Sequence, residues 1–308
     1  MDDSERAPLV RVICGPTAAG KTRAALALAR SHAVSIVSAD SRQLYRGFDI
    51  GTAKPSHEER TAVPHEGVDV LEPMERASAA WWAERADGWI RTASAQARVP
   101  LVVGGTGLYL RALFGALFEE PPMDADARRA LQQELGALSV AELRRWVERL
   151  DPARAHLGRT QLLRALEIAL LTGRRMSELH AERRTTPRWR ARYLVVDPGD
   201  RLQRDIRARV ESMIAEGWVE EVERLVETVP EDAPAWNASG YGAIRDVVQG
   251  RARVAHAVER VTIETRQYAK RQRTWFRHQL AGEDVTRVDP ARDGWEEVIE
   301  TWWHESDG

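Results

Sequence analysis

The segment Gly15-Pro16-Thr17-Ala18-Ala19-Gly20-Lys21-Thr22 matches the phosphate-binding loop pattern G-x-x-x-x-G-K-[ST] in full. An apolar, β-branched run, Leu9 to Cys14, stands before it, and the helix-forming residues 22–30 follow. In this order, the backbone N–H groups of the loop point at a phosphate group at the helix N-terminus. Lys21 adds a mobile positive charge, and the Thr22 hydroxyl offers a ligand to Mg²⁺. Residues 15–22 are therefore predicted to bind a phosphate or diphosphate group.

Two further strand-like runs end in turn residues. Residues 33–39 end at Asp40-Ser41, and residues 99–103 end at Gly104-Gly105-Thr106-Gly107, with a helical segment after each turn. Such alternation of strand and helix predicts an α/β fold with a parallel sheet, whose ligands collect at the carboxyl ends of the strands.

The character of the chain changes at Glu119-Glu120-Pro121-Pro122. Amphipathic helices are predicted over residues 127–138, 140–150 and 160–171, and a strand returns at Tyr193 to Val196. Residues 201–226 and 254–280 again read as helical. We therefore predict an α/β core made of residues 1–117 and 188–308, with an all-helical insertion of residues 118–187.

Composition limits the possible environments and partners. The 45 basic and 47 acidic residues give a formal net charge of −2, so any site for a polyanion must be a local patch. The single cysteine, Cys14, excludes an intramolecular disulfide and fits a reducing compartment. No apolar stretch is long enough to span a bilayer, and the N-terminus lacks the pattern of a signal peptide. We expect a cytoplasmic protein with no membrane partner.

Histidine and lysine are sparse. The eight histidines show no H-x-x-x-H or comparable spacing, and C-x-x-C is absent, so no structural zinc site is expected. Only three of the 45 basic residues are lysines, and all three, Lys21, Lys54 and Lys270, lie in motif-like segments. Lysine provides a compact point charge that arginine does not imitate. The sequence gives no role for Lys54 beyond a fixed extended loop before Pro55.

Asp40 and Thr106 follow two of the predicted strands. Asp40 is either a proton acceptor or metal ligand beside the loop, or a capping residue of a turn. Thr106, between glycines, either reaches a ligand or only completes a turn. The third strand is not followed by the aspartate that ATPases of this loop class place there for Mg²⁺ and water activation, so a nucleotide hydrolase is disfavoured.

The densest basic segment spans residues 264–278. At helical spacing, Arg266, Lys270, Arg273 and Arg277 form one stripe, and Tyr268, Gln272 and Trp275 form another. Cations beside aromatic rings suit an RNA backbone and its unstacked bases, whereas a solvated helix face is the simpler interpretation.

Together these segments resemble the tRNA dimethylallyltransferase family over nearly the whole chain. The matching blocks, in the order of the family, are GPTAAGKT at 15–22, ADSRQLY at 39–45, GTAKP at 51–55, VVGGTGLYLRAL at 102–113, RALEIALLTGRRMSELH at 164–180, MIAEGWVEEVERL at 213–225, ASGYGAI at 238–244 and TRQYAKRQRTWFR at 265–277. The resemblance implies a core like that of P-loop NTPases. It also implies transfer of a dimethylallyl group from its diphosphate to N6 of adenosine 37 in tRNA.

The resemblance also assigns roles to residues. Asp40 would be the general base, Thr106 would lie near the reacting groups, and Lys21 would act on the leaving diphosphate. The diphosphate would be held by Gly15, Pro16, Thr17, Ala18, Ala19, Gly20, Lys21, Thr22 and Arg209, with Thr22 on Mg²⁺. The implied tRNA contacts are Asp40, Ser41, Arg42, Gln43, Thr106, Arg128, Gln161, Arg164, Gly240, Tyr241, Arg245, Lys270, Arg271, Gln272, Arg273, Thr274, Trp275, Phe276 and Arg277. The helical insertion would contact the anticodon stem-loop, and a monomer is expected.

This chain departs from the family pattern in three places. The segment Leu157 to Leu163, before Arg164, is shorter than in the family and lacks Pro-Asn-Asp. In Asp205-Ile206-Arg207-Ala208-Arg209, only Arg209 is a fair candidate for the diphosphate. The family's Gly-Tyr-Lys or Gly-Tyr-Arg reads Gly240-Tyr241-Gly242, so Arg245 is the substitute cation.

Three other functions compete. A kinase with the same loop would use Asp40 to deprotonate an alcohol, but it leaves the basic segment unexplained. A prenyltransferase acting on free adenine nucleotides needs less RNA-facing surface than the insertion provides. A non-catalytic RNA-binding module would not need the intact Lys21, Thr22 and Asp40.

Overall fold

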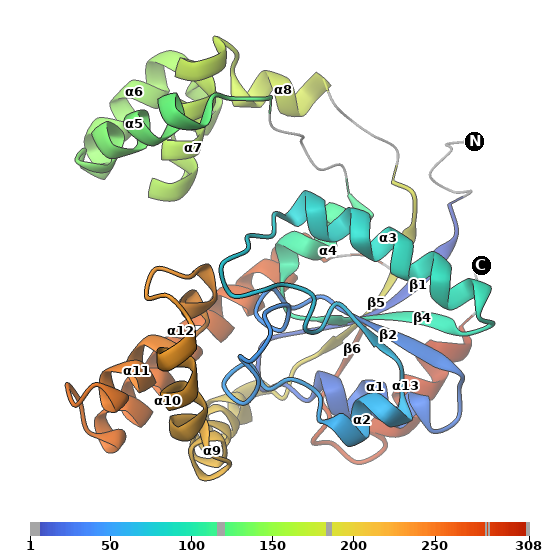
Figure 1. Cartoon of the computed structure of the whole chain (residues 1–308). Helices are drawn as coiled ribbons and strands as arrows, with labels where there is room; N and C mark the ends of the chain where they lie inside the picture. Colours follow the sequence, from blue (N-terminus) through green and yellow to red (C-terminus); the bar gives the residue numbers. More distant parts are fainter. Residues whose placement is uncertain (1–6, 116–120, 183–186, 281, 283, 306–308) are drawn as a thin grey trace. The chain divides into compact units, whose positions relative to one another are not determined.

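In the computed structural model, residues 7–115, 121–182, 187–280, 282 and 284–305 are described (Figure 1). The chain divides into two compact units, one of Met1–Phe114 with Pro187–Gly308 and one of Gly115–Thr186. The boundaries proposed from sequence, at residues 118 and 187, lie close to these.

The first unit contains a six-stranded sheet. Its strands, in the order β3-β2-β4-β1-β5-β6, are all parallel to their neighbours. Their bounds are β1 Leu9–Cys14, β2 Val34–Ser38, β3 His65–Glu66, β4 Val99–Gly104, β5 Arg190–Val196 and β6 Val285–Val288. The predicted parallel α/β sheet is confirmed.

Alternate residues of the strands pack into separate cores on the two faces of the sheet. On β1, Val12 and Cys14 join one core, and Ile13 joins the other. Helices α3 (Ala79–Ala95) and α4 (Gly107–Phe114) cover the first face, and α1 (Lys21–Ala29) and α13 (Trp295–His304) cover the second (Figure 1).

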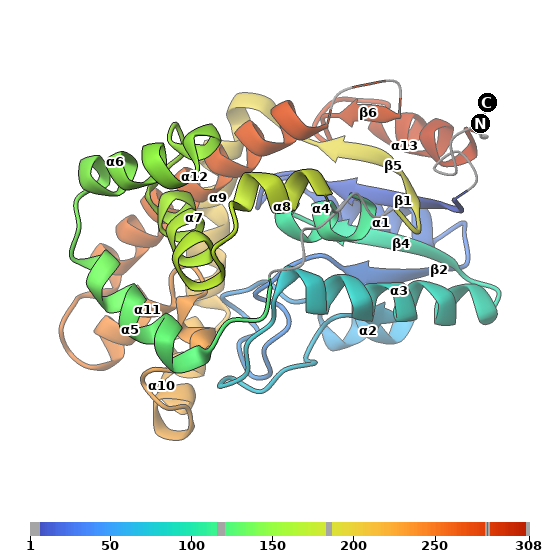
Figure 2. The ribbon, with the colours of Figure 1, turned by 90° about the horizontal axis from the view of Figure 1, so that it is seen from above.

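The carboxyl ends of the strands point toward a group of four helices (Figure 2). These are α9 (Leu202–Ala215), α10 (Trp218–Thr228), α11 (Tyr241–Val248) and α12 (Val254–Gln279), while the short α2 (His57–Ala62) precedes β3. Ligands of a parallel sheet bind at this edge, so α9 to α12 supply the other wall of any site there.

The prediction of one helical stretch over residues 201–226 is wrong in detail. Gly217, with φ of 98°, ends α9 and is the N-cap of α10. The prediction for residues 254–280 is confirmed by α12. Strand β6 and helix α13 had no prediction, because β6 is only Val285–Val288 and carries Arg287 within it.

The described part of the second unit contains helices and no strand. They are α5 (Ala125–Gly136), α6 (Val140–Leu150), α7 (Arg159–Thr172) and α8 (Met176–Glu182). Ser139 and Glu142 form a capping box at the start of α6. A small apolar core joins the helices, centred on Leu135, Leu143, Val147, Leu162 and Leu166.

No helix in the described part of the chain, in either unit, is long and apolar enough to cross a bilayer.

Candidate active site

The glycine loop connects β1 to α1 in a conformation that depends on its glycines. Gly15 has φ of 148°, and a Cβ there would lie 2.2 Å from the carbonyl oxygen of Val196. Gly20, with φ of 92°, is the N-cap of α1. Lys21 folds back so that its Nζ donates to the Pro16 carbonyl at 2.8 Å. This arrangement places the lysine against the loop that it is predicted to serve.

Lys21 and Arg209 are cations held in a desolvated place. Burial lowers the pKa of Lys21 to about 8, opposed by the attraction of Asp40, while the repulsion of Arg209 adds to the lowering. Burial also lowers the pKa of Arg209, and Asp40 and Glu216 partly restore it. Two half-buried cations that share one nearby carboxylate favour a bound anion.

Asp40 is fixed at the end of β2. Its Oδ1 accepts a hydrogen bond from the Arg42 backbone N–H at 2.9 Å. Thr106 joins this turn to the end of β4, because its Oγ1 accepts from the Ser41 N–H at 3.2 Å and its own N–H donates to Ala39 at 3.1 Å. Asp40 also lines the cleft described next, so both of its interpretations have support, whereas Thr106 is not among the residues that line it.

A cleft at the carboxyl edge of the sheet has a charged part and an apolar part. Its polar lining includes Thr17, Lys21, Asp40, Arg42 and Arg209, and its apolar lining comprises Ile206, Val210, Met213, Trp218, Ala238 and Val261. A second hollow, of about 150 Å³, follows the glycine loop and is lined by five of the same residues, Thr17, Lys21, Asp40, Thr52 and Arg209. The two hollows therefore meet at the same cations and carboxylate.

Tyr268 of α12 lines the cleft and was not among the predicted site residues. Its side chain is hydrogen-bonded with Thr106, and burial, assisted by Asp40, raises its pKa to about 12. The phenol therefore stays protonated and can act as a hydrogen-bond donor at neutral pH. The signal in the sequence was the stripe of Tyr268 with Gln272, which was interpreted as RNA-facing.

The oxygen ligands beside the loop fit Mg²⁺. Thr22 and Asp40 line the hollow around the loop together. One hydroxyl and one carboxylate form an incomplete, all-oxygen set, and Mg²⁺ characteristically completes such sets with water and substrate phosphates.

Helix α12 contributes fewer surface contacts than predicted. Gln272 and Phe276 are buried, and both ends of the Gln272 amide bond to the core. Arg273 bonds to Asp197 and to the Gly199 carbonyl. Gln272 also lines the cleft, so its contact with RNA stays a prediction, whereas the RNA-contact prediction for Phe276, which is 2% exposed, is wrong for this structure. The predicted contact residues that remain exposed on the helix are Lys270, Arg271, Thr274 and Arg277, while Trp275 is half-buried.

The predicted contacts around α11 are also internal. Tyr241 is fully buried, and its hydroxyl donates to Glu221 Oε1 at 2.6 Å. Gly240 is buried too, and a Cβ there would meet the Trp218 ring at 2.4 Å. Arg245 lies over the Trp236 ring at 5.0 Å and donates to the Glu231 carbonyl. Gly240 and Tyr241 are thus corrected to packing residues, and Arg245 is largely engaged within the protein.

The loop after β2 is held from both sides. Glu221 Oε2 accepts from the N–H groups of Asp49 and Ile50, at 3.1 and 2.7 Å. Lys54, whose side chain is only 2% exposed, bonds to Asp49, Asp69 and the Tyr45 carbonyl. Lys54 therefore ties the loop together, a role that its sequence position did not indicate.

Gln43 belongs to the same internal network. Its Oε1 accepts from the Ser38 hydroxyl at 2.9 Å, and its Nε2 donates to the Ala53 carbonyl at 3.0 Å. Both ends of the amide thus have a structural role, while the residue also lines the hollow around the glycine loop, so its RNA contact stays a prediction. Ser41 and Arg42 remain half-exposed at the same turn.

In the second unit, the three predicted RNA contacts lie near α7. The buried carboxylate of Glu167 accepts hydrogen bonds from Arg128 at 3.1 Å and Arg164 at 2.5 Å, as well as from Gln132 at 2.9 Å. The Gln161 side chain accepts from the Gly158 N–H at 3.1 Å and caps α7. Arg128, which is 36% exposed, is the more accessible of the two arginines, since Arg164 is 17% exposed.

Comparisons with known proteins identify the family. A profile of the IPP transferase family matches residues 43–279, and one of isopentenyl transferases matches residues 8–64. A tRNA dimethylallyltransferase of Thermomicrobium roseum is 41% identical, with 96% of this chain and 90% of the relative covered. One of Anaeromyxobacter sp. (strain Fw109-5) is 43% identical, with 92% and 96% covered.

A solved structure has the same architecture. The crystal structure of the full-length tRNA isopentenylpyrophosphate transferase of Bacillus halodurans aligns with a TM-score of 0.67 at 32% identity, covering 96% of this chain and 94% of that one. The profile match covers more than half of the chain, and the relatives align over nearly their full length. The chain therefore belongs to the tRNA dimethylallyltransferase family of prenyltransferases.

Proposed function

We propose that the protein transfers a dimethylallyl group from dimethylallyl diphosphate to N6 of adenosine 37 in tRNA and releases diphosphate. The names of the relatives support transfer to tRNA. The observation that carries the assignment of the donor is the two-part cleft, in which Lys21 and Arg209 adjoin an apolar lining. A five-carbon chain attached to a diphosphate has the same division into apolar and charged ends.

In the proposed reaction, the bond between C1 of the dimethylallyl group and the diphosphate oxygen breaks, and its electron pair leaves with the diphosphate. The N6 lone pair forms the new bond to C1. N6 gives up a proton, and Asp40 is the proposed acceptor because this carboxylate lines both the cleft and the hollow around the glycine loop. Negative charge grows on the departing diphosphate, so Lys21, Arg209 and the loop amides act most strongly at that stage.

Thr106 and Tyr268 are the proposed positioning groups beside Asp40. Thr106 holds the turn that carries Asp40 through the Ser41 N–H. Tyr268 is hydrogen-bonded with Thr106 and lines the cleft. Its ring also offers a face against which an unstacked base can pack.

We propose that Mg²⁺ assists this reaction, with Thr22 as a direct ligand and Asp40 as the carboxylate that lines the same hollow. When bound, the ion supplies positive charge to the diphosphate oxygens. The protein's own contribution is the hydroxyl at the start of α1 and the loop amides around it.

The proposed RNA surface includes Lys270, Arg271, Thr274 and Arg277, which are exposed on α12, with the half-exposed Ser41 and Arg42, of which Arg42 lines the cleft. Within the second unit, Arg128, Gln161 and Arg164 are the proposed contacts to the anticodon stem-loop. Arginine side chains suit the RNA backbone because their planar groups bind phosphates through two donors. The monomeric state and the cytoplasmic location stay predictions.

The proposal is tested with dimethylallyl diphosphate labelled in the alkyl group. Label should enter a tRNA with adenosine at position 37 without ATP, and should not enter the same tRNA with guanosine at that position. Label in free AMP alone, or phosphate transfer from ATP, would contradict the proposal.

A further inference from the structure

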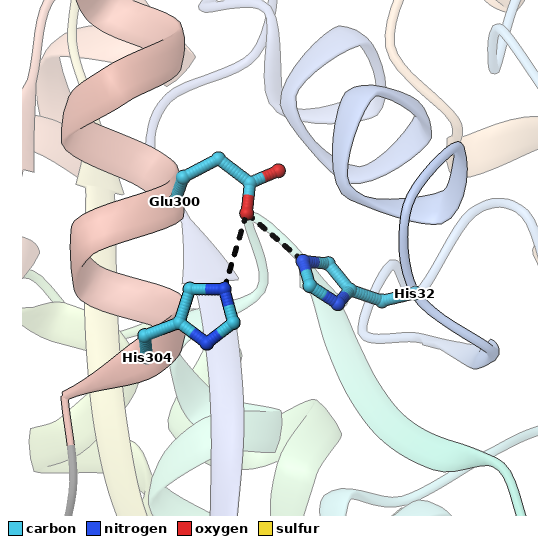
Figure 3. Close-up of side chains that lie close together, drawn as sticks. All are labelled: His32, Glu300 and His304. Carbon is cyan, nitrogen blue, oxygen red and sulfur yellow. Dashed lines mark hydrogen bonds and ion pairs between the residues drawn. The ribbon is translucent and has the colours of Figure 1, made fainter.

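Three metal-binding types of side chain meet at the end of α1 that is remote from the glycine loop. They are His32, in the turn before β2, and Glu300 and His304, one turn apart on α13 (Figure 3). His32 Nε2 lies 2.9 Å from Glu300 Oε2, and His304 Nε2 lies 3.7 Å from the same oxygen. One ligand atom from each residue lies within 4.8 Å of the other two.

The scaffold around these side chains is held by packing. The His32 ring stacks on Trp303 with centroids 4.8 Å apart, and the Arg11 guanidinium lies 4.9 Å from the same indole. Ile299 and Trp302 anchor α13 in the core that also contains Leu28 of α1. The backbone positions of the three residues are therefore set by packing, independently of a metal ion.

The distances fit a small transition cation after slight side-chain rotation. Zinc binds imidazole nitrogen and carboxylate oxygen at about 2.0–2.2 Å, so ligand atoms around a tetrahedral ion lie about 3.3 Å apart. The separations of 2.9 and 3.7 Å from Glu300 bracket that value. The two histidines, whose ligand atoms lie within 4.8 Å of each other, come to it by rotation of the exposed His304 side chain. Two imidazoles and one carboxylate form a donor set for zinc-like ions, and three protein ligands leave a fourth position for water.

The charges nearby favour a cation on balance. A separate hollow beside α13 is lined by Glu296, Glu297 and Glu300, and Arg30 is the basic residue that lines it with them. His304 is 69% exposed, so an ion has access from solvent, whereas His32 is 17% exposed.

We propose that His32, Glu300 and His304 bind one divalent transition cation of the zinc class, which fastens the C-terminal helix to the turn after α1. The site lies outside the proposed reaction. Helix α1 is about 14 Å long, with Lys21 and Thr22 at its first turn and His32 just beyond its last. The expected effect is on the stability of the α/β unit, and the argument does not depend on dimethylallyl transfer.

The ligand spacing explains why the sequence did not indicate this site. Glu300 and His304 form the local pair E-x-x-x-H, but His32 is separated from Glu300 by 268 positions. The expectation of no structural zinc site rested on the spacing of histidines and cysteines alone, and it did not consider a carboxylate with a remote histidine.

The test uses metal-free full-length protein titrated with Co²⁺ in excess Mg²⁺, because four-coordinate Co²⁺ gives visible absorption bands. His304→Gln removes one exposed ligand with little risk to folding. His278→Gln, at an exposed histidine of α12, is the matched control. Co²⁺ bound at Thr22 or Asp40 would be common to both variants, so the difference between them reports on the cluster.

The proposal predicts that wild type and His278→Gln each bind one equivalent of Co²⁺ with visible absorption bands. Zn²⁺ should displace the Co²⁺ and abolish these bands. His304→Gln and Glu300→Gln should not show them. Zn²⁺ should also raise the melting temperature of wild type and His278→Gln but not of His304→Gln. The proposal is overturned if wild type shows no bands, or if His304→Gln and Glu300→Gln keep both the bands and the melting shift. The three residues would then be only a hydrogen-bonded pair beside a surface histidine.

Discussion

Gln272 of α12 is bonded to Thr17 of the glycine loop, 255 positions away in the chain. The Gln272 Oε1 accepts the Thr17 backbone N–H at 2.9 Å, and its Nε2 donates to the Gly105 carbonyl at 2.8 Å. One buried side chain thus joins the loop after β1, the turn after β4 and the helix that carries Tyr268. It fixes the distance between the glycine loop and the wall of the cleft.

Replacing Gln272 should therefore weaken donor binding more than tRNA binding. Gln272→Ala leaves the Thr17 N–H and the Gly105 carbonyl without their partner, which costs about 1–3 kcal/mol of stability. We expect a higher KM for dimethylallyl diphosphate and a lower melting temperature. Gln267→Ala, at an exposed position of the same helix, should change neither. A loss of tRNA affinity alone would instead support the interpretation of Gln272 as an RNA contact.

Lys54 should stabilise the loop after β2 through its specific hydrogen bonds, and the loss of a lysine elsewhere should not have this effect. Lys54→Met leaves Asp49 and Asp69 without the ammonium that bonds to both, although Arg60 still pairs with Asp69. Because Asp49 is more than half exposed, we expect a modest loss of about 1–2 kcal/mol in urea unfolding, with reduced activity. Lys270→Met, at an exposed lysine, should leave stability unchanged. Equal unfolding curves for wild type and Lys54→Met would disprove the role.

The lowered pKa of Lys21 predicts a pH dependence of anion binding. Lys21 is charged below a pKa of about 8 and loses its proton as pH rises through that value. Affinity for inorganic diphosphate, measured by calorimetry at constant Mg²⁺, should therefore fall several-fold between pH 7 and pH 9 beyond the change caused by the ligand's own titration. Lys21→Arg keeps its charge and senses the same ligand titration, so its curve is the baseline. Parallel curves for the two proteins would refute the prediction.

The exposed cations of α12 should contribute salt-dependent affinity for tRNA. Lys270→Ala and Arg277→Ala should each weaken binding and lower the slope of log K against log salt by up to about one unit. Arg273→Ala should have a smaller effect on binding, because its guanidinium bonds to Asp197. The control is Arg30→Ala, because Arg30 is an exposed arginine at the C-terminal end of α1 and is not part of the proposed RNA surface. If all four variants bind alike at every salt concentration, the stripe is only a solvated face.

Local patterns in the sequence were sufficient to predict the main elements of the fold. The glycine loop, the three buried strands and the amphipathic helices of the insertion each fall within one short segment, so their residues predicted them directly. The same holds for the grouping of Asp40 and Thr106, because strand ends of a parallel sheet meet at one edge.

What local patterns did not reveal were contacts between distant segments. The family resemblance implied tRNA contacts for Tyr241 and Gln272, yet Glu221 and the Thr17 N–H satisfy them in the interior. A helical pattern alone does not tell which polar side chains have buried partners. Arg209 was also carried over from the family pattern, and in its case the fold brings the residue to the cleft with Lys21 and Asp40.

The most direct test of the proposed chemistry is the single-turnover rate of Asp40→Asn with saturating tRNA and dimethylallyl diphosphate. Asparagine keeps the shape of the side chain and its acceptor for the Arg42 N–H but does not take a proton at neutral pH. We predict that the transfer rate falls by about 10²- to 10⁴-fold while the dissociation constants of both substrates change by less than about threefold. An unchanged transfer rate, or a loss explained entirely by weaker binding, would contradict the assignment of Asp40 as the base.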